Sequence, residues 1–176
     1  MDNILNAVTS RTKAVIVCNP NNPSGVVYSK KELANLAKQL DSDKRYEDVW
    51  IISDEIYERL DFVNEFKSFA TLPNMAKRTV TINGFSKGYG MTGLRLGWLT
   101  GPKHVISAAA TMQSQTTHAP CSLSQEAGIS ALKTDLKIMT PFYEETKQRR
   151  DIVVNTIRSK LTSKQVRFAP PNGALY

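Results

Sequence analysis

Short apolar runs alternate with segments of helical periodicity along this chain. Nearly continuous apolar runs at residues 13–18, 49–52 and 78–82 predict strands that are buried on both faces, as a parallel sheet requires. A fourth run, at residues 96–99, predicts another strand. Strands that alternate with helices favour an α/β fold, in which a mostly parallel sheet is flanked by helices.

The helical segments are marked by caps and by spacing. Ser29 and Glu32 form a capping box, and apolar residues then repeat at helical spacing as far as Leu40. Polar residues at 113–121 predict a loop, and residues 166–169 predict the beginning of a strand. Three further helices are predicted at residues 103–111, 122–132 and 139–161.

The last of these helices is long enough to connect two domains. Pro141 lies near its start, a position that suits the first turn of a helix. We therefore expect residues 1–138 to form one domain. Residues 139–176 would be an interdomain helix and the beginning of a smaller domain.

Composition is ordinary for a soluble globular protein. Of 176 residues, 41% are hydrophobic and 22% are charged, and no apolar run is long enough to cross a bilayer. The first eleven residues lack the basic flank and apolar core of a secretory signal. Cys18 and Cys121 are expected to be buried, reduced thiols in a reducing compartment, either cytoplasm or an organelle matrix. His104 and His118 are isolated, so no metal site is expected.

The formal charge of +7 is unevenly distributed. No acidic residue occurs between Phe66 and Gln125, whereas six lysines and arginines do. An anionic ligand near this stretch is one interpretation, and a solvated basic face is the other. Nucleic acid is disfavoured because no nucleic-acid motif is present and the aromatic residues are scattered.

Polar side chains follow the first two predicted strands. Asn19 and Asn22 lie in a dense cluster of turn residues, Asn-Pro-Asn-Asn-Pro-Ser-Gly. Asp54 follows the second strand, and Tyr57 comes three residues later. Because ligands bind beyond the carboxyl ends of strands in open α/β sheets, these residues are candidates for a site. A turn at the asparagines and a helix cap at Asp54 are the structural alternatives.

The third strand leads into a glycine-rich loop with one amine, Lys87, and one guanidinium, Arg95. Such an amine can form a Schiff base, and a guanidinium can bind a phosphate with two donors. The glycines at 88, 90 and 93 match the dinucleotide fingerprint literally. That fingerprint needs a helix after the glycines and an acidic residue about 20 positions on. Here a strand-like segment follows, and no acid occurs before Glu126, so a nicotinamide site is disfavoured.

Three motifs together carry a family resemblance. Asn-Pro-Asn-Asn-Pro-Ser-Gly, Asp-Glu-Ile-Tyr, and Ser-Lys with an arginine eight residues after the lysine resemble the fold-type I pyridoxal-phosphate-dependent aminotransferases of class I/II. The lysine loop is most similar to the bacterial and plant-type aspartate/prephenate aminotransferase branch. The resemblance covers nearly the whole chain but less than half of a family member. It implies that residues 1–138 are part of the cofactor-binding large domain, and that the chain is an internal fragment of a homodimeric enzyme.

The resemblance also implies a role for each motif residue. Lys87 would hold pyridoxal 5'-phosphate as a Schiff base and act as the general base. Asp54 would bond the pyridine nitrogen of the cofactor, and Arg95 would bind its phosphate. Asn22 and Tyr57 would donate to the phenolate oxygen. The implied reaction is transamination between an amino acid of the aspartate or glutamate type and a 2-oxo acid.

The sequence departs from the family pattern in places. Ser86 adjoins the lysine, whereas many members have a phosphate-binding serine two or three residues before it, where this chain has Gly84. The family's N-terminal phosphate loop, its ring-stacking aromatic residue and its carboxylate-binding arginine would all lie outside residues 1–176. A β-lyase or synthase on the same fold, or an inactive binding protein, would carry the same core residues, so the sequence leaves these alternatives open.

Overall fold

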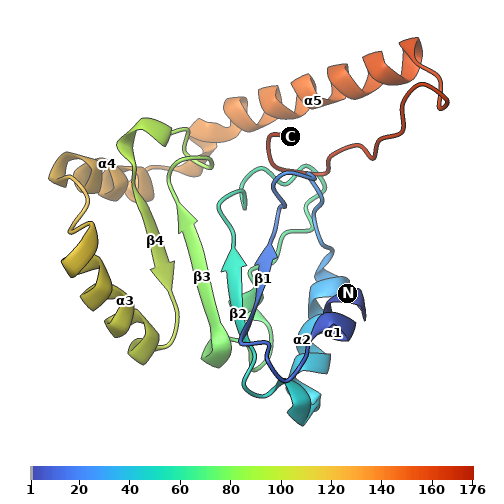
Figure 1. Cartoon of the computed structure of the whole chain (residues 1–176). Coiled ribbons are helices and arrows are strands. Elements are labelled where there is room, and N and C mark those ends of the chain that lie inside the picture. Colours follow the sequence, from blue (N-terminus) through green and yellow to red (C-terminus); the bar gives the residue numbers. More distant parts are fainter. Residues whose placement is uncertain (1) are drawn as a thin grey trace.

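The protein, described here from a computed structural model that covers residues 2–176, is built on a four-stranded sheet (Figure 1). Its strands are β1 (Ala14–Cys18), β2 (Trp50–Asp54), β3 (Thr79–Gly84) and β4 (Gly97–Thr100), in that spatial order. The first three are parallel, and β4 is antiparallel to β3. The predicted mostly parallel sheet is therefore confirmed, with strand bounds within two residues of those expected.

Helices flank this sheet. The α-helices are α1 (Asp2–Ala7), α2 (Lys30–Ser42), α3 (Lys103–Thr116), α4 (Ser122–Lys133) and α5 (Thr140–Lys160). Short 3-10 turns occupy η1 (Lys44–Tyr46), η2 (Phe69–Thr71), η3 (Ala76–Arg78), η4 (Thr92–Leu94) and η5 (Leu136–Met139). No helix among residues 2–176 is both long and apolar enough to cross a bilayer.

The main core forms between α2 and one face of the sheet. The predicted capping box begins α2: the Ser29 hydroxyl accepts from the Glu32 amide, and the Glu32 carboxylate accepts from the Ser29 amide at 2.9 Å. The apolar stripe of α2 then packs on the sheet, because residues three and four apart share one helix face. The cluster contains Leu33, Leu36, Ala37 and Leu40 of α2 together with Val17 of β1 and Ile51 of β2.

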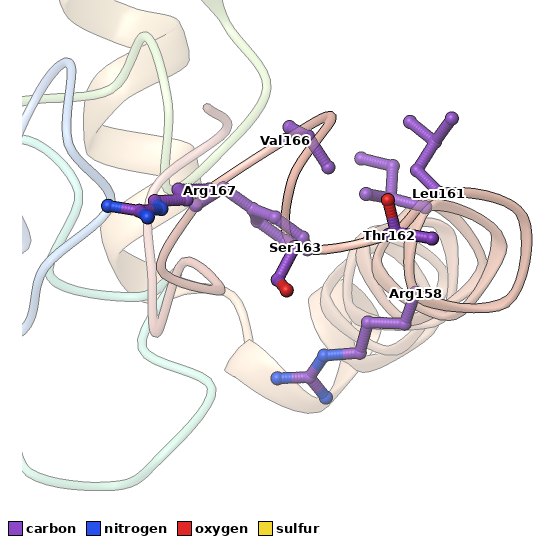
Figure 2. Close-up of a pocket in the computed structure, with 8 residues that line it drawn as sticks. Arg158, Leu161, Thr162, Ser163, Val166 and Arg167 are labelled. Carbon is purple, nitrogen blue, oxygen red and sulfur yellow. The ribbon is translucent and has the colours of Figure 1, made fainter.

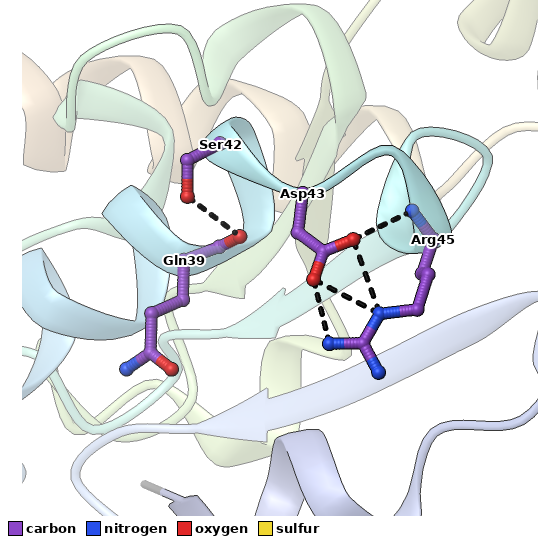
Figure 3. A network of polar contacts seen from close by, with 4 residues as sticks. All are labelled: Gln39, Ser42, Asp43 and Arg45. Carbon is purple, nitrogen blue, oxygen red and sulfur yellow. Dashed lines mark hydrogen bonds and ion pairs between the residues drawn. The ribbon is translucent and has the colours of Figure 1, made fainter.

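A compact polar turn ends α2 and leads to the second strand (Figure 3). The Ser42 hydroxyl donates to the Gln39 carbonyl at 3.4 Å. The Asp43 carboxylate caps η1 by accepting from the Arg45 amide, and it also pairs with the Arg45 guanidinium at 2.6 Å. The hydrogen bonds from Arg45 lower the pKa of the Asp43 carboxyl. The pair is exposed to solvent, so its role is to shape the turn rather than to stabilise the fold.

Arg78 is buried beneath this turn and is only 8% exposed. Its guanidinium donates to the carbonyls of Val49, at 2.9 Å, and Leu40, at 3.1 Å, and also to that of Tyr46. These carbonyls lie at the end of α2, in η1 and just before β2. Although Arg78 belongs to the stretch that lacks acids, it is a structural residue and not part of a basic surface.

Replacement of Arg78 by methionine should destabilise the protein by about 3 kcal/mol, since charge-assisted hydrogen bonds to buried carbonyls are lost together. Chemical denaturation followed by circular dichroism would measure the change. Lys77→Met is the matched control, because Lys77 is the exposed neighbour, and its effect should be within about 0.5 kcal/mol. Equal midpoints for the two variants would contradict the structural role of Arg78.

Above the sheet, α5 runs along the edge where β1, β2 and β3 end (Figure 1). The segment after α5 returns over the same edge, and it pairs with the loop after β2 through the isolated bridge between Asp61 and Gly173. A small cluster joins these layers, with Tyr57, Leu60 and Ala174 at its centre and Phe142 packed against it. The carboxyl edge of the parallel strands is thus covered by the C-terminal part of the chain.

Several sequence predictions are wrong. The strands are not buried on both faces: Ile16 of β1 is 70% exposed and Ile82 of β3 is 42% exposed, so one face of the sheet is left partly uncovered. Residues 166–169 form no strand, because no neighbouring strand among residues 2–176 offers them a hydrogen-bonding edge. The loop predicted at 113–121 begins only after Thr116: α3 continues through its polar end, where hydroxyls such as that of Thr116 bond back to helix carbonyls. Cys121, predicted to be buried, is exposed just before α4, and Cys18 is half-buried; both thiols are free.

Candidate functional site

Asp54, Asn22 and Tyr57 lie at the carboxyl edge of the parallel strands. Asp54 is the last residue of β2 and is in register with Cys18 of β1 and Ile82 of β3. Its Oδ1 accepts from the Ile56 amide at 3.2 Å, which fixes the carboxylate at the strand end. Asn22 and Tyr57 lie in the turns that leave β1 and β2. The half-buried Asp54 therefore lies at the same edge of the sheet as Asn22 and Tyr57.

Asn22 and Tyr57 converge on one phenolic oxygen. The Asn22 Nδ2 donates to the Tyr176 hydroxyl at 3.1 Å, and the Tyr57 and Tyr176 hydroxyls are hydrogen-bonded at 3.0 Å. The two tyrosine rings meet edge to face, with centroids 5.9 Å apart. The Asn22 amide donor and the Tyr57 hydroxyl thus both lie within hydrogen-bonding distance of a single oxygen atom.

Tyr176 is a site residue to which the sequence analysis assigned no role. The preceding turn brings it there, because the amides of Asn172 and Gly173 both donate to the Gly25 carbonyl, at 2.7 and 3.0 Å. The Ala174 amide donates to the Leu60 carbonyl at 2.8 Å. The sequence shows the Pro-Asn-Gly-Ala-Leu-Tyr motif that contains Tyr176. It does not show that this motif pairs with segments about 115 and 150 residues earlier in the chain.

Asn19, the other asparagine of the first turn, has a structural role. It is 2% exposed, and its Oδ1 accepts from the Tyr28 amide at 2.9 Å. The backbone amide of Asn19 donates to the Asp54 carbonyl at 3.0 Å. Asn19 therefore joins the first turn to the end of β2, while Asn22 remains exposed at the tip of the turn.

Lys87 lies in a tight turn directly after β3. The Gly90 amide donates to the Lys87 carbonyl at 3.3 Å, and the Met91 amide donates to the Phe85 carbonyl at 3.1 Å. The half-buried lysine directs its Nζ over the Tyr57 ring, 5.8 Å from the centroid. An amine, a carboxylate and two neutral donors therefore share one edge of the sheet.

Ser86 and Arg95 lie on the two limbs of the loop between β3 and β4. Gly84 pairs with Gly97, and the Phe85 amide donates to the Leu96 carbonyl at 3.2 Å. Beyond this pair the two limbs leave the sheet, with Ser86 in the turn that carries Lys87 and Arg95 directly after η4. A Cβ at Gly84 would lie 2.9 Å from the Gly97 Cα, so the hairpin needs glycine there. Arg95 is exposed, and its Nη1 donates to the Thr92 carbonyl at 3.0 Å.

The backbone of Arg95 adopts a left-handed conformation, with φ 49° and ψ 44°. This conformation is uncommon for residues other than glycine, and such residues gather at functional sites. It turns the chain from η4 into β4. None of the hydrogen bonds or ion pairs among residues 2–176 joins Arg95 or Ser86 to Lys87, so a shared site for them remains a prediction.

Burial sets the protonation of the hydroxyl and thiol groups at this edge. Burial raises the pKa of Tyr57 strongly, and its hydrogen bond to Tyr176 adds to the increase. Tyr57 therefore remains a neutral hydroxyl that can donate. Burial also raises the pKa of the Cys18 thiol, and the negative charge of Asp54 raises it further. Cys18 is thus a neutral thiol beside the carboxylate.

Glu55, directly after Asp54, is a buried carboxyl that accepts three hydrogen bonds next to the site. It is 3% exposed, and its Oε1 accepts from the hydroxyls of Ser53, at 2.7 Å, and Ser68, at 2.9 Å, and from the Phe69 amide at 3.1 Å. Burial raises the pKa of the Glu55 carboxyl, although these hydrogen bonds oppose the increase. The carboxyl joins the loop around η2 to the end of β2.

The raised pKa of Glu55 has a consequence for stability. Because the folded state binds this proton more tightly than the unfolded state, the stability contribution is present below the ordinary carboxyl pKa. It is lost as the pH rises through the raised, folded-state value. Glu55→Gln should therefore remove part of the decrease in unfolding free energy between about pH 4 and 7. Urea denaturation across this range would measure it, and an unchanged pH profile would contradict the argument.

Two hollows lie near α5, and they differ in their relation to the site. The first, about 610 Å³, lies between α5 and the returning C-terminal segment; Phe142, Val153 and Phe168 line it, and Tyr176 connects it to the site. The second, about 420 Å³, lies at the far end of α5 (Figure 2). Figure 2 shows the guanidinium groups of Arg158 and Arg167 lying apart, so they do not form a joint anion site there. Within residues 2–176, no three potential metal-ligand side chains gather.

Comparison with known proteins shows which family this chain resembles. The family model described as aminotransferase class I and II matches residues 1–176. An aspartate/prephenate aminotransferase of Cereibacter sphaeroides is 41% identical over 172 residues, which are 97% of this chain and 42% of that protein. A bifunctional aspartate aminotransferase and glutamate/aspartate-prephenate aminotransferase of Petunia hybrida is 38% identical over 96% of this chain and 35% of its own length.

Solved structures agree with the sequence comparison. The aspartate aminotransferase of Rhizobium meliloti superposes with a TM-score of 0.88 at 35% identity, over 98% of this chain and 42% of that one. An aromatic aminotransferase of Pyrococcus horikoshii has the same TM-score at 32% identity, over 98% of this chain and 45% of that one. The chain thus spans about two fifths of the length of these relatives.

Proposed function

This chain belongs to the class I and II aminotransferase family, and from that premise we propose that the protein carrying it transfers an amino group between an amino acid and a 2-oxo acid. The relatives named for aspartate and prephenate suggest an amino acid of the aspartate or glutamate type. The structural neighbour named for aromatic substrates shares the same fold, so the fold alone does not select the substrate.

The residues of the site fit pyridoxal phosphate. The observation that supports this assignment is the convergence of Asn22 and Tyr57 on one phenolic oxygen, with which both side chains form hydrogen bonds at once. Pyridoxal phosphate carries a phenolic oxygen, a pyridine nitrogen, an aldehyde and a phosphate. The chain has a candidate partner for each in the Asn22 and Tyr57 pair, Asp54, Lys87, and the Arg95 and Ser86 pair.

When bound, pyridoxal phosphate supplies an aldehyde that condenses with amines and a ring that accepts electrons from the α-carbon. Lys87 would hold the cofactor through its Nζ and would move the proton at the substrate α-carbon. The Asp54 carboxylate would keep a proton on the pyridine nitrogen. The neutral Tyr57 hydroxyl, together with Asn22 Nδ2, would donate to the phenolic oxygen.

Arg95 and Ser86 would bind the phosphate. An arginine can offer two parallel donors to phosphate oxygens, and the serine hydroxyl adds a third. Both residues lie in the loop between β3 and β4, which supports a shared role. We also propose that residues 1–138 are part of the large domain and 139–176 the connection to a smaller one. The parent enzyme would be a homodimer.

The function is tested in the whole gene product that contains this chain. A panel of amino donors is offered with 2-oxoglutarate, and formation of glutamate is measured. Aspartate-dependent glutamate formation would support the proposal. Release of pyruvate and ammonia without any need for a keto acid would instead indicate a β-lyase.

Titration of the 176-residue chain with the cofactor is a separate test: an absent visible absorbance band would mean that this part alone does not bind the cofactor.

A further inference from the structure

The turn that carries Lys87 is fastened to the beginning of α5. The hydroxyl of Tyr143, the fourth residue of that helix, donates to the Gly88 carbonyl at 2.7 Å. Gly88 is the residue directly after Lys87, and its carbonyl belongs to the Gly88–Tyr89 peptide unit, so the bond fixes the turn one residue beyond the lysine. The two partners are 55 residues apart in sequence. This contact connects α5 directly to the lysine turn.

A second side chain packs against the same glycine. A Cβ at Gly88 would lie 3.0 Å from the Cδ and 3.2 Å from the Cγ of Arg59, so the aliphatic part of Arg59 touches the turn. The Arg59 guanidinium lies over the Tyr89 ring, 5.2 Å from its centroid, and its Nη2 approaches the Tyr89 hydroxyl at 3.4 Å. Arg59 is partly buried in this position. The turn is therefore held at Gly88 by a hydrogen bond and by packing.

The beginning of α5 is itself fixed to the other half of the site. Phe142 and Tyr143 both pack against the cluster that contains Tyr57 and Leu60. Burial raises the pKa of Tyr143, so its hydroxyl stays protonated and donates to the carbonyl. One helix turn thus contacts both the Tyr57 segment, over whose ring the Lys87 amine lies, and the backbone that carries the lysine.

We propose that Tyr143 is a positioning residue for Lys87, because its hydroxyl holds the Gly88 carbonyl and thereby keeps the amine beside Tyr57. The inference rests on the proposed function of Lys87. Tyr143 does not itself reach reacting atoms: it acts through the backbone of the turn. Losing the bond would leave the turn in place but would let the lysine sample more positions, and misplaced catalytic groups lower the rate of the chemical step.

The test compares Tyr143→Phe with Thr146→Val in the whole gene product. The first variant keeps the aromatic packing and removes only the hydroxyl. The second removes a hydroxyl from the same helix, one whose 2.8 Å bond to the Phe142 carbonyl stays within the helix. Hydrogen exchange of the peptide that covers residues 87–90 is measured in the cofactor-free protein. Transamination kinetics are measured in the loaded enzyme.

Tyr143→Phe should speed exchange in this peptide by about three- to tenfold, the range expected for loss of one hydrogen bond. It should lower kcat by a similar factor, with KM changed less than about twofold. Thr146→Val should leave both near the wild-type values. Unchanged exchange in Tyr143→Phe, faster exchange with unchanged kcat, or equal losses in both variants would each overturn the proposal.

The experiment also separates this inference from the proposed function. Borohydride reduction followed by peptide mass spectrometry shows whether the wild-type protein attaches the cofactor at Lys87. Labelling at another residue would refute the proposed function and, with it, the positioning role. Labelling at Lys87 combined with unchanged exchange in Tyr143→Phe would leave the proposed function standing and would overturn only the role of Tyr143.

Discussion

Replacement of Lys87 by alanine is expected to abolish cofactor attachment and almost all transamination in the gene product that contains this chain. The amine lies over the Tyr57 ring at the carboxyl edge of the sheet, and the variant removes both the nucleophile and the proposed base. Loss of proton transfer alone should cost roughly 10²–10⁴-fold in rate. The measurements are the visible absorbance band of the loaded protein and the rate of glutamate formation.

Lys103→Ala is the matched control for this variant. Lys103 is an exposed lysine in the same acid-free stretch, at the first position of α3. Its replacement removes one positive charge without touching the site, so the absorbance band and the rate should be retained. If Lys87→Ala kept wild-type transamination, or if borohydride fixed the cofactor to another lysine, the assignment of Lys87 would be wrong.

Asp54→Asn is expected to lower the transamination rate by about 10²–10³-fold, the usual cost of removing one preorganised electrostatic contact. The substitution removes the negative charge of the side chain and keeps its shape. An asparagine Oδ1 can still accept from the Ile56 amide, which Asp54 Oδ1 does at 3.2 Å, so the strand end should keep its shape. What is lost is the negative charge that would keep a proton on the cofactor nitrogen.

Rates and thermal unfolding should both be recorded for Asp54→Asn, because loss of a cofactor contact lowers the rate alone, whereas loss of a structural contact also lowers the stability. Asp48→Asn is the control: Asp48 is an exposed carboxylate shortly before the same strand. An Asp54→Asn enzyme within twofold of the wild-type rate would remove Asp54 from the site. A slow enzyme that is also strongly destabilised would point to a structural role of the carboxylate instead.

Much of the fold was predictable because the local rules agree with one another. The apolar runs that end at Cys18 and Ile52 became adjacent parallel strands, and the Ser29 and Glu32 capping box begins the helix between them. These features depend on residues close together in sequence. The strand expected at 166–169 failed because a strand also needs a partner edge, which no local pattern specifies.

The same distinction applies to the candidate site. Residue types and spacing singled out Asn22, Asp54, Tyr57 and Lys87, and strand ends were expected to bring them to one edge. The structure adds that Asn22 and Tyr57 meet at one oxygen, and that the oxygen belongs to Tyr176. It also shows that Arg78, which belongs to the same basic stretch as Lys87, is buried against backbone carbonyls.

The sequence by itself determined the strands, the capped helix and the turn that presents Lys87, because propensity, periodicity and loop chemistry act over a few residues. Only the tertiary structure decided which distant groups hold that turn. Tyr143 reaches the Gly88 carbonyl from another helix, and Tyr176 reaches Asn22 across 154 residues. Such contacts depend on how packed layers are placed relative to one another, and no short stretch of sequence encodes that placement.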